Sequence, residues 1–344
     1  MTARAFITGL ASTSLSAAER SFLREAKPWG VILFQRNIED PEQVRRLTGS
    51  VRAALGWNAP ILVDQEGGRV QRLAPPHWPA YPAGAVYGRL FRQSAESGKR
   101  AALLAGLNIA ADLLAVGIDV DCAPIADVPV RGADAIIGDR AYGDTPESVA
   151  TIARALADGL LAGGVLPVLK HLPGHGRATA DSHRRLPKVE TELAQLRASD
   201  FAAFRPLADL PLGMTAHVLY AAIDPIAPAT SSVTVIRQVI RDWIGFGGLL
   251  MTDDISMGAL SGAIAERSRA AISAGCDLVL HCNGELAEME QVASAAPALA
   301  GEAAVRAEAA LALRGRQETP DVVALRAELA NVLGGAAELH RASL

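Results

Sequence analysis

The residues best suited to acid and base chemistry are concentrated in one short part of the chain. Residues 170–183 contain three histidines and two cations among two glycines and a proline, which disfavour regular structure. Asp181 stands two positions before His183, so its carboxylate can orient the imidazole and favour the protonated form. The apolar run 164–169 precedes this stretch and indicates a short buried strand. We therefore interpret the stretch as a catalytic loop at a strand end rather than a solvated surface loop.

Other charged and hydrogen-bonding groups stand soon after apolar runs elsewhere in the chain. They are Asp64 and Arg72, Asp127 and Arg140, Lys170 and His171, His217, and Asp253 and Asp254. If the runs are parallel strands of a barrel, these groups converge at one mouth. Carboxylates and cationic donors together suit the hydroxyl groups of a sugar. Glycoside hydrolysis needs a carboxylate nucleophile or base and an acid on the other side of the bond.

Eight short apolar runs supply the expected strands. They lie at 5–10, 30–34, 60–63, 118–122, 167–169, 212–216, 248–252 and 277–282. Most are separated by amphipathic stretches with helix signals, at 16–26, 41–55, 95–116, 146–162, 192–207, 234–244 and 264–274. Apolar strands that alternate with helices predict a parallel sheet covered by helices. Eight such units predict an α/β fold with a closed (β/α)8 barrel of the TIM type, and an open doubly wound sheet is the alternative.

The chain is expected to form a single domain over residues 1–344. The catalytic motifs fall within 60–260, and the residues from about 285 to 344 are expected to form extra packing helices. Four prolines exclude a helix over 73–82.

The composition limits the classes of partner. Hydrophobic residues make up 50% of the 344 residues and aromatic residues only 4%, which predicts an aliphatic core. The net charge of −4 gives no reason to expect nucleic acid or an anionic membrane as a partner. The N-terminal segment lacks the apolar stretch of a signal peptide, and no run of about eighteen apolar residues occurs. Three cysteines in largely apolar segments indicate reduced thiols and a cytoplasmic protein.

Several other chemistries lack their sequence signals. No GxGxxG follows a strand, and the chain has neither a GxxxxGK[ST] phosphate loop nor a Ser-His-Asp spacing. Four side chains are metal ligands by type: His171, His175, His183 and Asp253. Pro173 and its neighbouring glycine, however, work against the helix that would align His171 with His175. We therefore expect no metal and no cofactor.

Five motifs resemble those of a known family, the bacterial β-N-acetylhexosaminidases of glycoside hydrolase family 3, the NagZ type. The similar region runs from about residue 5 to residue 285, with the motifs in the family's order. They are VDQEGGRVQR at 63–72, IGDRAYG at 137–143, KHLPGHGRATADSH at 170–183, MTAHV at 214–218 and TDDISM at 252–257. Leu172 replaces the family's usual aromatic residue and Thr252 its common serine, and neither position carries chemistry.

The resemblance implies a retaining mechanism with a covalent glycosyl-enzyme intermediate. Asp253 matches the nucleophile, His183 matches the general acid/base, and Asp181 orients His183. Strand alternation alone cannot choose between Asp253 and Asp254, and the family motif chooses the first. A helix-capping or loop-bracing role is expected for Asp254.

The resemblance also implies a set of substrate-binding residues. They are Asp64, Arg72, Arg140, Lys170 and His171. Asp64 can accept hydroxyl hydrogen bonds, which strengthen against a charged acceptor, and Lys170 and Arg140 supply donors. The alternative for both arginines is a structural salt bridge to Glu66 or Asp139.

The resemblance implies the function of an exo-β-N-acetylglucosaminidase in cell-wall recycling. The expected substrate is a peptidoglycan-derived fragment, GlcNAc-1,6-anhydroMurNAc with or without peptide, and a monomer is expected. From the residues alone, only a glycosidase for aminosugars or neutral sugars follows. Three alternatives stay open: a β-glucosidase of the wider family, phosphorolysis instead of hydrolysis, and a non-catalytic sugar-binding barrel.

Overall fold

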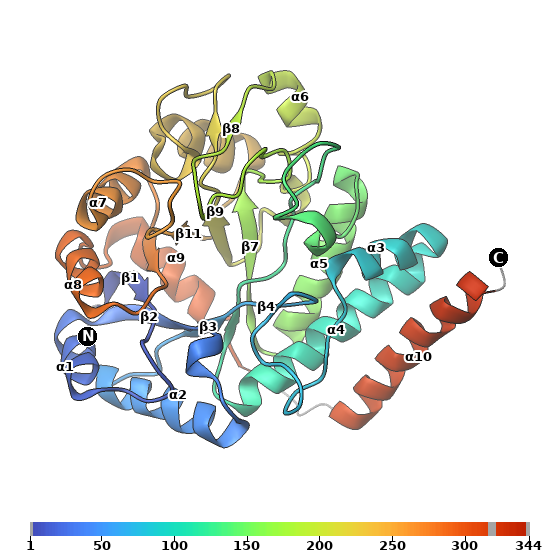
Figure 1. Ribbon diagram of the computed structural model, residues 1–344, viewed down its shortest axis with the longest axis horizontal. Helices are drawn as coiled ribbons and strands as arrows, with labels where there is room; N and C mark the ends of the chain where they lie inside the picture. Colours follow the sequence, from blue (N-terminus) through green and yellow to red (C-terminus); the bar gives the residue numbers. More distant parts are fainter. Residues whose placement is uncertain (1–2, 316–320, 342–344) are drawn as a thin grey trace.

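The computed structural model describes residues 3–315 and 321–341, and eight parallel strands form a closed barrel at its centre (Figure 1). Each barrel strand pairs with the next one along the chain, and β12 closes the barrel by pairing with β1. The strands are β1 (Arg4–Thr8), β2 (Pro28–Leu33), β3 (Ile61–Val63), β6 (Val120–Asp121), β7 (Leu166–Leu172), β9 (Leu212–Thr215), β11 (Leu249–Asp254) and β12 (Leu278–His281). Each overlaps a run predicted as a strand. The predicted (β/α)8 fold is therefore confirmed, and the open-sheet alternative is wrong.

Alternate residues of each strand face the barrel interior and the surrounding helices. On β11, Leu249 and Met251 pack inside the barrel, whereas Leu250 packs against the helices. The pairing of β11 with β12 shifts by one residue between Met251 and Asp254; beyond the shift, Asp253 faces the barrel mouth, whereas Asp254 bonds to Ser256 and Cys282. The structure thereby separates two neighbouring aspartates that the strand pattern alone left equivalent.

Helices surround the barrel, and most of them overlap a stretch predicted as a helix. They are α1 (Ala17–Ala26), α2 (Pro41–Leu55), α3 (Gly84–Gln93), α4 (Ala95–Ala115), α5 (Pro146–Ala162), α6 (Leu193–Ala198), the π-helix η5 (Val235–Ile244) and α7 (Ile264–Ala274). At α1, the Ser16 hydroxyl accepts from the Glu19 amide at 3.1 Å, and the Glu19 carboxylate accepts from the Ser16 amide at 2.9 Å. This reciprocal capping satisfies donors that the first turn of a helix leaves free.

The predicted helix over 192–207 is wrong in its extent. Only α6 is α-helical, and a short 3₁₀ turn, Arg205–Leu207, follows it. The buried Asp200 carboxylate accepts from the Ser199 hydroxyl and from Arg177, which turns the chain away from the helix. Pro206 has no amide hydrogen to continue the ladder. Helix α3 was not predicted at all.

The proline-rich segment 73–82 contains no helix, as predicted. It follows the hairpin of β4 (Gln65–Gly67) and β5 (Val70–Gln71), which projects from the carboxyl end of β3. A second small sheet pairs β8 (Lys188–Val189) with β10 (Leu219–Tyr220).

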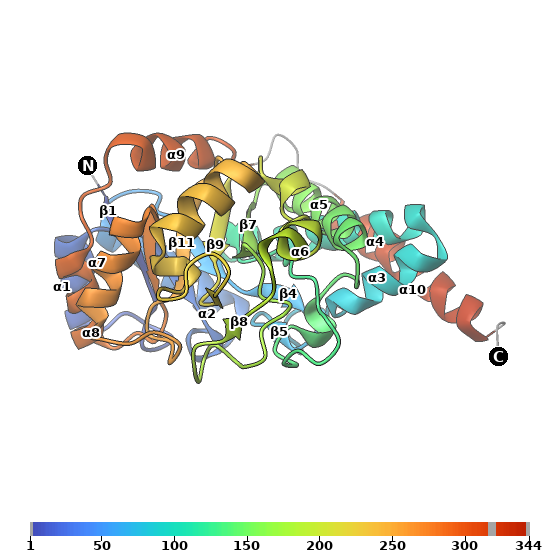
Figure 2. The same cartoon turned by 90° about the horizontal axis from the view of Figure 1, so that it is seen from above.

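Three helices follow the barrel, as expected for the C-terminal part of the chain. They are α8 (Leu286–Ala295), α9 (Gly301–Leu311) and α10 (Val322–Arg341). Helix α9 crosses one end of the barrel (Figure 2), where Ala307 and Ala310 pack against the interior cluster. Helix α10 lies along α4, and Arg326 pairs with Asp112 at 2.5 Å. Within residues 3–315 and 321–341, no helix has both the length and the apolarity needed to cross a bilayer.

The contact between α4 and α5 predicts a large cost for one added methyl group. Gly106 of α4 faces the Leu156 carbonyl and the backbone of Gly159, so a β-carbon there would clash. We expect Gly106→Ala to lower the free energy of unfolding by ~1–3 kcal/mol through overpacking.

The matched control is Gly49→Ala on α2, where an added β-carbon meets nothing within 4 Å. It should raise the free energy of unfolding by ~0.5–1 kcal/mol, because alanine is the better helix former. Urea unfolding measures both variants. Equal effects would contradict the packing described.

Candidate active site

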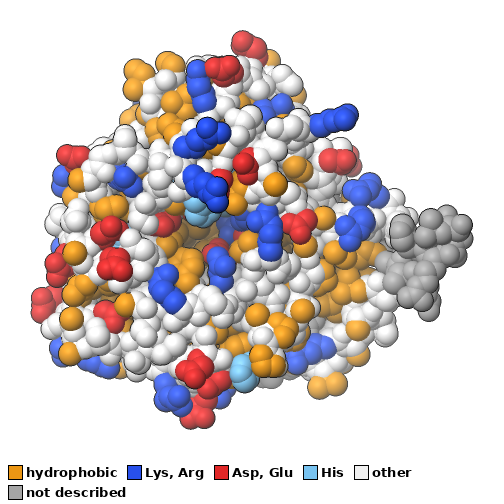
Figure 3. Space-filling view, viewed as in Figure 1, with side chains coloured by type: hydrophobic (Ala, Val, Ile, Leu, Met, Phe, Trp, Pro, Cys, Tyr) orange, Lys and Arg blue, Asp and Glu red, His pale blue; other side chains and the backbone are white. Residues whose placement is uncertain are grey.

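A cavity of about 240 Å³ opens at the carboxyl ends of the barrel strands. Figure 3 shows the hollow at the centre of this face, with Lys and Arg side chains around its opening. The lining residues are Asp64, Glu66, Arg69, Val70, Arg72, Ile136, Ile137, Arg140, His171, His175, Ser182, His183 and Asp253. Of the eight predicted site residues, Lys170 and Asp181 are not in the lining, and each bonds directly to a residue that is.

Lys170 and Arg72 hold Asp64 in its ionised form. The Lys170 ammonium lies 2.9 Å from one carboxylate oxygen of Asp64, and Nη2 of Arg72 lies 3.1 Å from the other. Burial alone would raise the pKa of Asp64, but these two charges outweigh it and keep the pKa well below its usual range. Asp64 is therefore a charged hydrogen-bond acceptor in the cavity.

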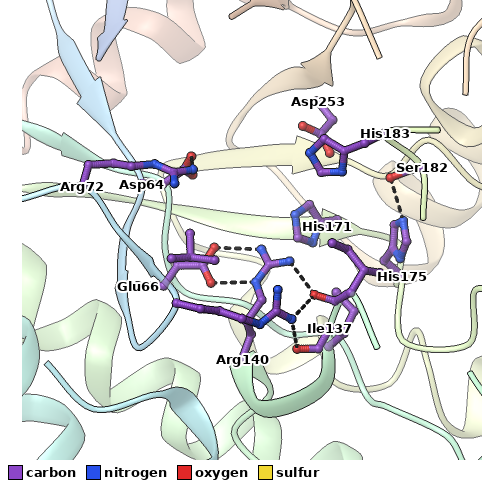
Figure 4. A pocket seen from close by; sticks show the side chains of 13 residues that line it. Asp64, Glu66, Arg72, Ile137, Arg140, His171, His175, Ser182, His183 and Asp253 are labelled. Carbon is purple, nitrogen blue, oxygen red and sulfur yellow. Dashed lines mark hydrogen bonds and ion pairs between the residues drawn. The ribbon is translucent and has the colours of Figure 1, made fainter. Parts of the chain in front are cut away.

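Arg140 forms a two-pronged ion pair with Glu66. Nε lies 2.9 Å from Oε2 and Nη2 lies 2.8 Å from Oε1 (Figure 4). Glu66 also pairs with Lys170 at 2.7 Å. The structural salt bridge to Glu66, considered as the alternative for Arg140, is thus present. Nη1 of Arg140 donates to the Ile136 carbonyl at 3.0 Å, and because a guanidinium carries five N–H groups, some remain beyond these contacts.

For Arg72, the considered salt bridge to Glu66 or Asp139 is wrong, since its partner is Asp64. Asp139 pairs instead with Arg69, at 3.1 Å. The Arg69 guanidinium also donates to the Ile136 carbonyl at 2.6 Å, which fixes the 135–139 segment beside the β4–β5 hairpin. These contacts of Arg69 hold in place the part of the cavity wall that Ile136 and Ile137 form.

A buried aspartate fixes the ring of His171. Nδ1 of His171 lies 2.7 Å from Oδ2 of Asp127, and Oδ1 of Asp127 accepts from the His175 amide at 2.6 Å. Burial would raise the pKa of Asp127, but the two histidines and these hydrogen bonds lower it. An ionised Asp127 requires a proton on Nδ1 of His171, so Nε2 is the ring nitrogen left for a molecule in the cavity.

Asp253 is an ionised carboxylate whose neighbour is engaged elsewhere. Burial would raise the pKa of Asp253, but the neighbouring imidazoles of His171 and His217 and the hydrogen bond from the Asp254 amide outweigh it and lower the pKa. One Asp253 oxygen accepts from the Asp254 amide at 2.8 Å. The Asp254 carboxylate instead accepts from the Cys282 amide at 3.0 Å and from Ser256. Asp254 therefore braces the loop, as expected.

His183 and Asp181 form a pair at the mouth of the cavity. Nδ1 of His183 lies 2.8 Å from Oδ1 of Asp181, which also accepts from the His183 amide at 2.9 Å. The side chain of His183 is 64% exposed and that of Asp181 is 25% exposed. The outer nitrogen of His183 is therefore free to meet a bound molecule, in the cavity that Asp253 also lines (Figure 4).

Four polar lining residues are absent from the predicted site. They are Glu66, Arg69, His175 and Ser182. A signal existed for Glu66, because it stands two residues after Asp64 and alternate residues share a face. Among the described residues, no group of three or more His, Cys, Asp or Glu side chains is placed to hold a metal ion.

The chain is similar to known proteins in sequence and in structure. The model described as "Glycosyl hydrolase family 3 N terminal domain" matches residues 6–312. The beta-hexosaminidase of Alkalilimnicola ehrlichii is 42% identical over 279 residues, which are 80% of this chain and 79% of that protein. The beta-hexosaminidase of Aromatoleum aromaticum is 38% identical over 320 residues, covering 92% and 88% of the two chains.

Two solved structures have the same fold. NagZ from Neisseria gonorrhoeae in complex with N-trifluoroacetyl-D-glucosamine superposes with a TM-score of 0.86 at 33% identity, covering 97% of this chain and 98% of that one. A family 3 beta-N-acetylglucosaminidase from Paenibacillus gives a TM-score of 0.83 at 28% identity, covering 95% and 67%.

The buried ring of His175 predicts a loss of stability at mildly acidic pH. Burial, together with the charge of His171, lowers the pKa of His175 to about 4. An unfolded histidine has a pKa of about 6.5. Above that pH the ring is neutral in both the folded and the unfolded state, so its burial costs little stability. As the pH falls toward about 4, the unfolded state takes up a proton that the folded state resists, and stability is lost.

Urea unfolding of the wild type and of His175→Gln, each at pH 7 and pH 5, tests this expectation. The glutamine amide does not titrate and can keep a contact with Ser182, which lies 3.1 Å from Nε2 of His175. Between the two pH values, the wild type should lose about 2 kcal/mol more than the variant. The same loss in both proteins would mean that His175 is not the responsible group.

Proposed function

Because the chain belongs to glycosyl hydrolase family 3 and is a β-N-acetylhexosaminidase, we propose that it cleaves terminal N-acetylglucosamine by a retaining, two-step mechanism. The observation that carries this proposal is the shared cavity of Asp253 and His183. One side chain is an ionised carboxylate and the other an imidazole held by an aspartate. These are the two kinds of group that the mechanism needs on either side of a glycosidic bond.

In the first proposed step, an Asp253 oxygen attacks the anomeric carbon of the sugar. The bond from that carbon to the leaving oxygen breaks, and protonated His183 gives its Nε2 proton to this oxygen. In the second step, neutral His183 takes a proton from water, whose oxygen attacks the same carbon and displaces Asp253. His183 is protonated again, and Asp253 returns to its ionised form.

We assign sugar binding to the charged floor of the cavity. Asp64 accepts hydrogen bonds from hydroxyl groups, and the free N–H groups of Arg140 donate to the sugar. Lys170 and Arg72 hold Asp64 ionised and add positive charge beside it. His171 offers its outer nitrogen, Nε2, as a further hydrogen-bonding group.

The proposal includes the substrate class and the cellular setting. We propose peptidoglycan-derived fragments that carry GlcNAc on 1,6-anhydroMurNAc, cleaved in the cytoplasm during cell-wall recycling by a monomeric enzyme. Support comes from the family motifs around Asp253 and His183. The free thiols of Cys122, Cys276 and Cys282 fit a reducing compartment.

The two neighbouring aspartates give a matched test of the nucleophile. We expect Asp253→Asn to lower kcat on a chromogenic N-acetylglucosaminide by ~10⁴-fold or more, since the attacking charge is lost. Asp254→Asn should lose far less, because one amide oxygen can still accept from the Ser256 and Cys282 amides. Activity near wild type in Asp253→Asn would end the assignment.

Leaving-group dependence tests His183. In His183→Ala, kcat/KM should fall by ~10²-fold or more on an alkyl or disaccharide substrate, whose leaving oxygen must be protonated. On the 2,4-dinitrophenyl glycoside it should change little, because that phenolate leaves without a proton. If both substrates lose activity equally, His183 is not the acid.

A further inference from the structure

The exposed histidine at the mouth is carried by a loop that needs an anchor. Asp181 fixes the His183 ring, but both residues belong to the same loop, 173–187, which has no α-helix or strand. Their mutual hydrogen bonds therefore set the ring's orientation within the loop and not its position over the cavity. Contacts that leave the loop must set that position.

The residue between the pair is connected to the rest of the protein through a second residue of the loop, His175. Ser182 is only 3% exposed, and its hydroxyl lies 3.1 Å from Nε2 of His175 (Figure 4). His175 is itself 3% exposed, and its amide donates to the buried Asp127 carboxylate at 2.6 Å. Ser182 is thus tied through His175 to the carboxylate that also orients His171.

Two further contacts come from the segment that follows β11, the strand that carries Asp253. The Gly258 amide donates to the His183 carbonyl at 3.2 Å, and the Ala259 amide donates to the Ser182 carbonyl at 3.0 Å. A β-carbon on Gly258 would lie 2.8 Å from the His183 carbonyl oxygen and 2.9 Å from that of Arg184. Glycine at 258 allows the two backbones to approach this closely.

From these contacts we infer that Ser182 and Gly258 are positioning residues, which together hold His183 over the sugar. Ser182 connects the loop through His175 to the buried Asp127, and Gly258 allows the loop to pack against the segment that follows Asp253. The inference rests on the proposed role of His183 as the acid. It adds the residues that position the acid relative to the nucleophile.

The test compares two leaving groups in Ser182→Ala. If the serine positions the acid, kcat/KM on an alkyl or disaccharide substrate should fall about tenfold, and on the 2,4-dinitrophenyl glycoside by less than about twofold. Inhibition by free N-acetylglucosamine should stay as in the wild type, because every side chain assigned to sugar binding is retained. Ser294→Ala, on the exposed face of α8, is the control and should match the wild type on both substrates.

Gly258→Ala is an independent test of the same inference, and it remains valid if Ser182→Ala fails to fold. It should show the same selective loss, since the methyl group pushes the His183 backbone away. Gly247→Ala is its control, because an added β-carbon there meets nothing within 4 Å. Equal loss on both leaving groups, or no loss on either, would overturn the inference.

His183→Ala, measured in parallel, separates the inference from the proposed function. If His183→Ala itself loses activity equally on both leaving groups, the acid assignment fails and the inference fails with it. If His183→Ala is selective while Ser182→Ala and Gly258→Ala are not, only the inference fails.

Discussion

One buried ammonium group organises the floor of the cavity. Lys170 lies 2.9 Å from Asp64 and 2.7 Å from Glu66, two carboxylates that would otherwise repel each other. Burial alone would raise the pKa of both carboxyl groups, and the nearby cations lower both. Both carboxylates therefore stay ionised, and each faces fixed partners. A sugar entering the cavity meets acceptors whose charge and direction are already set, so little reorganisation is needed on binding.

A third carboxylate close by shows what happens without a cation at contact distance. Asp121 is fully buried, and burial raises its pKa well above the ordinary value, although the Gln65 amide and Lys170 oppose this. Its Oδ1 accepts from the Gln65 amide at 2.9 Å, so it serves as a structural acceptor under the β4–β5 hairpin. Contact with the Lys170 ammonium thus distinguishes the ionised Asp64 and Glu66 from their neighbour Asp121.

The parts of the molecule that could be predicted are those fixed by local sequence. The barrel strands are apolar on both faces and stand out as runs, and the Asp181–His183 contact spans only two residues. Helix α3 was missed because Gly84 and Gly88 lower its helix propensity. They are there because a β-carbon at either position would clash with the backbone of the 140–142 segment. The Arg140–Glu66 pair spans 74 residues, so no local pattern could choose it over other partners.

Two histidine–aspartate pairs of the same geometry serve different needs in the proposed mechanism. The Nδ1 contacts are 2.7 Å in His171–Asp127 and 2.8 Å in His183–Asp181, but Asp127 is fully buried and His183 is 64% exposed. A histidine that binds the sugar needs one fixed tautomer, which a buried and ionised aspartate enforces. A histidine that gives up a proton and recovers it from water in every turnover must reach solvent. The exposure of His183 is therefore a requirement of its role, and the loop contacts of Ser182 and Gly258 limit the disorder that exposure would otherwise bring.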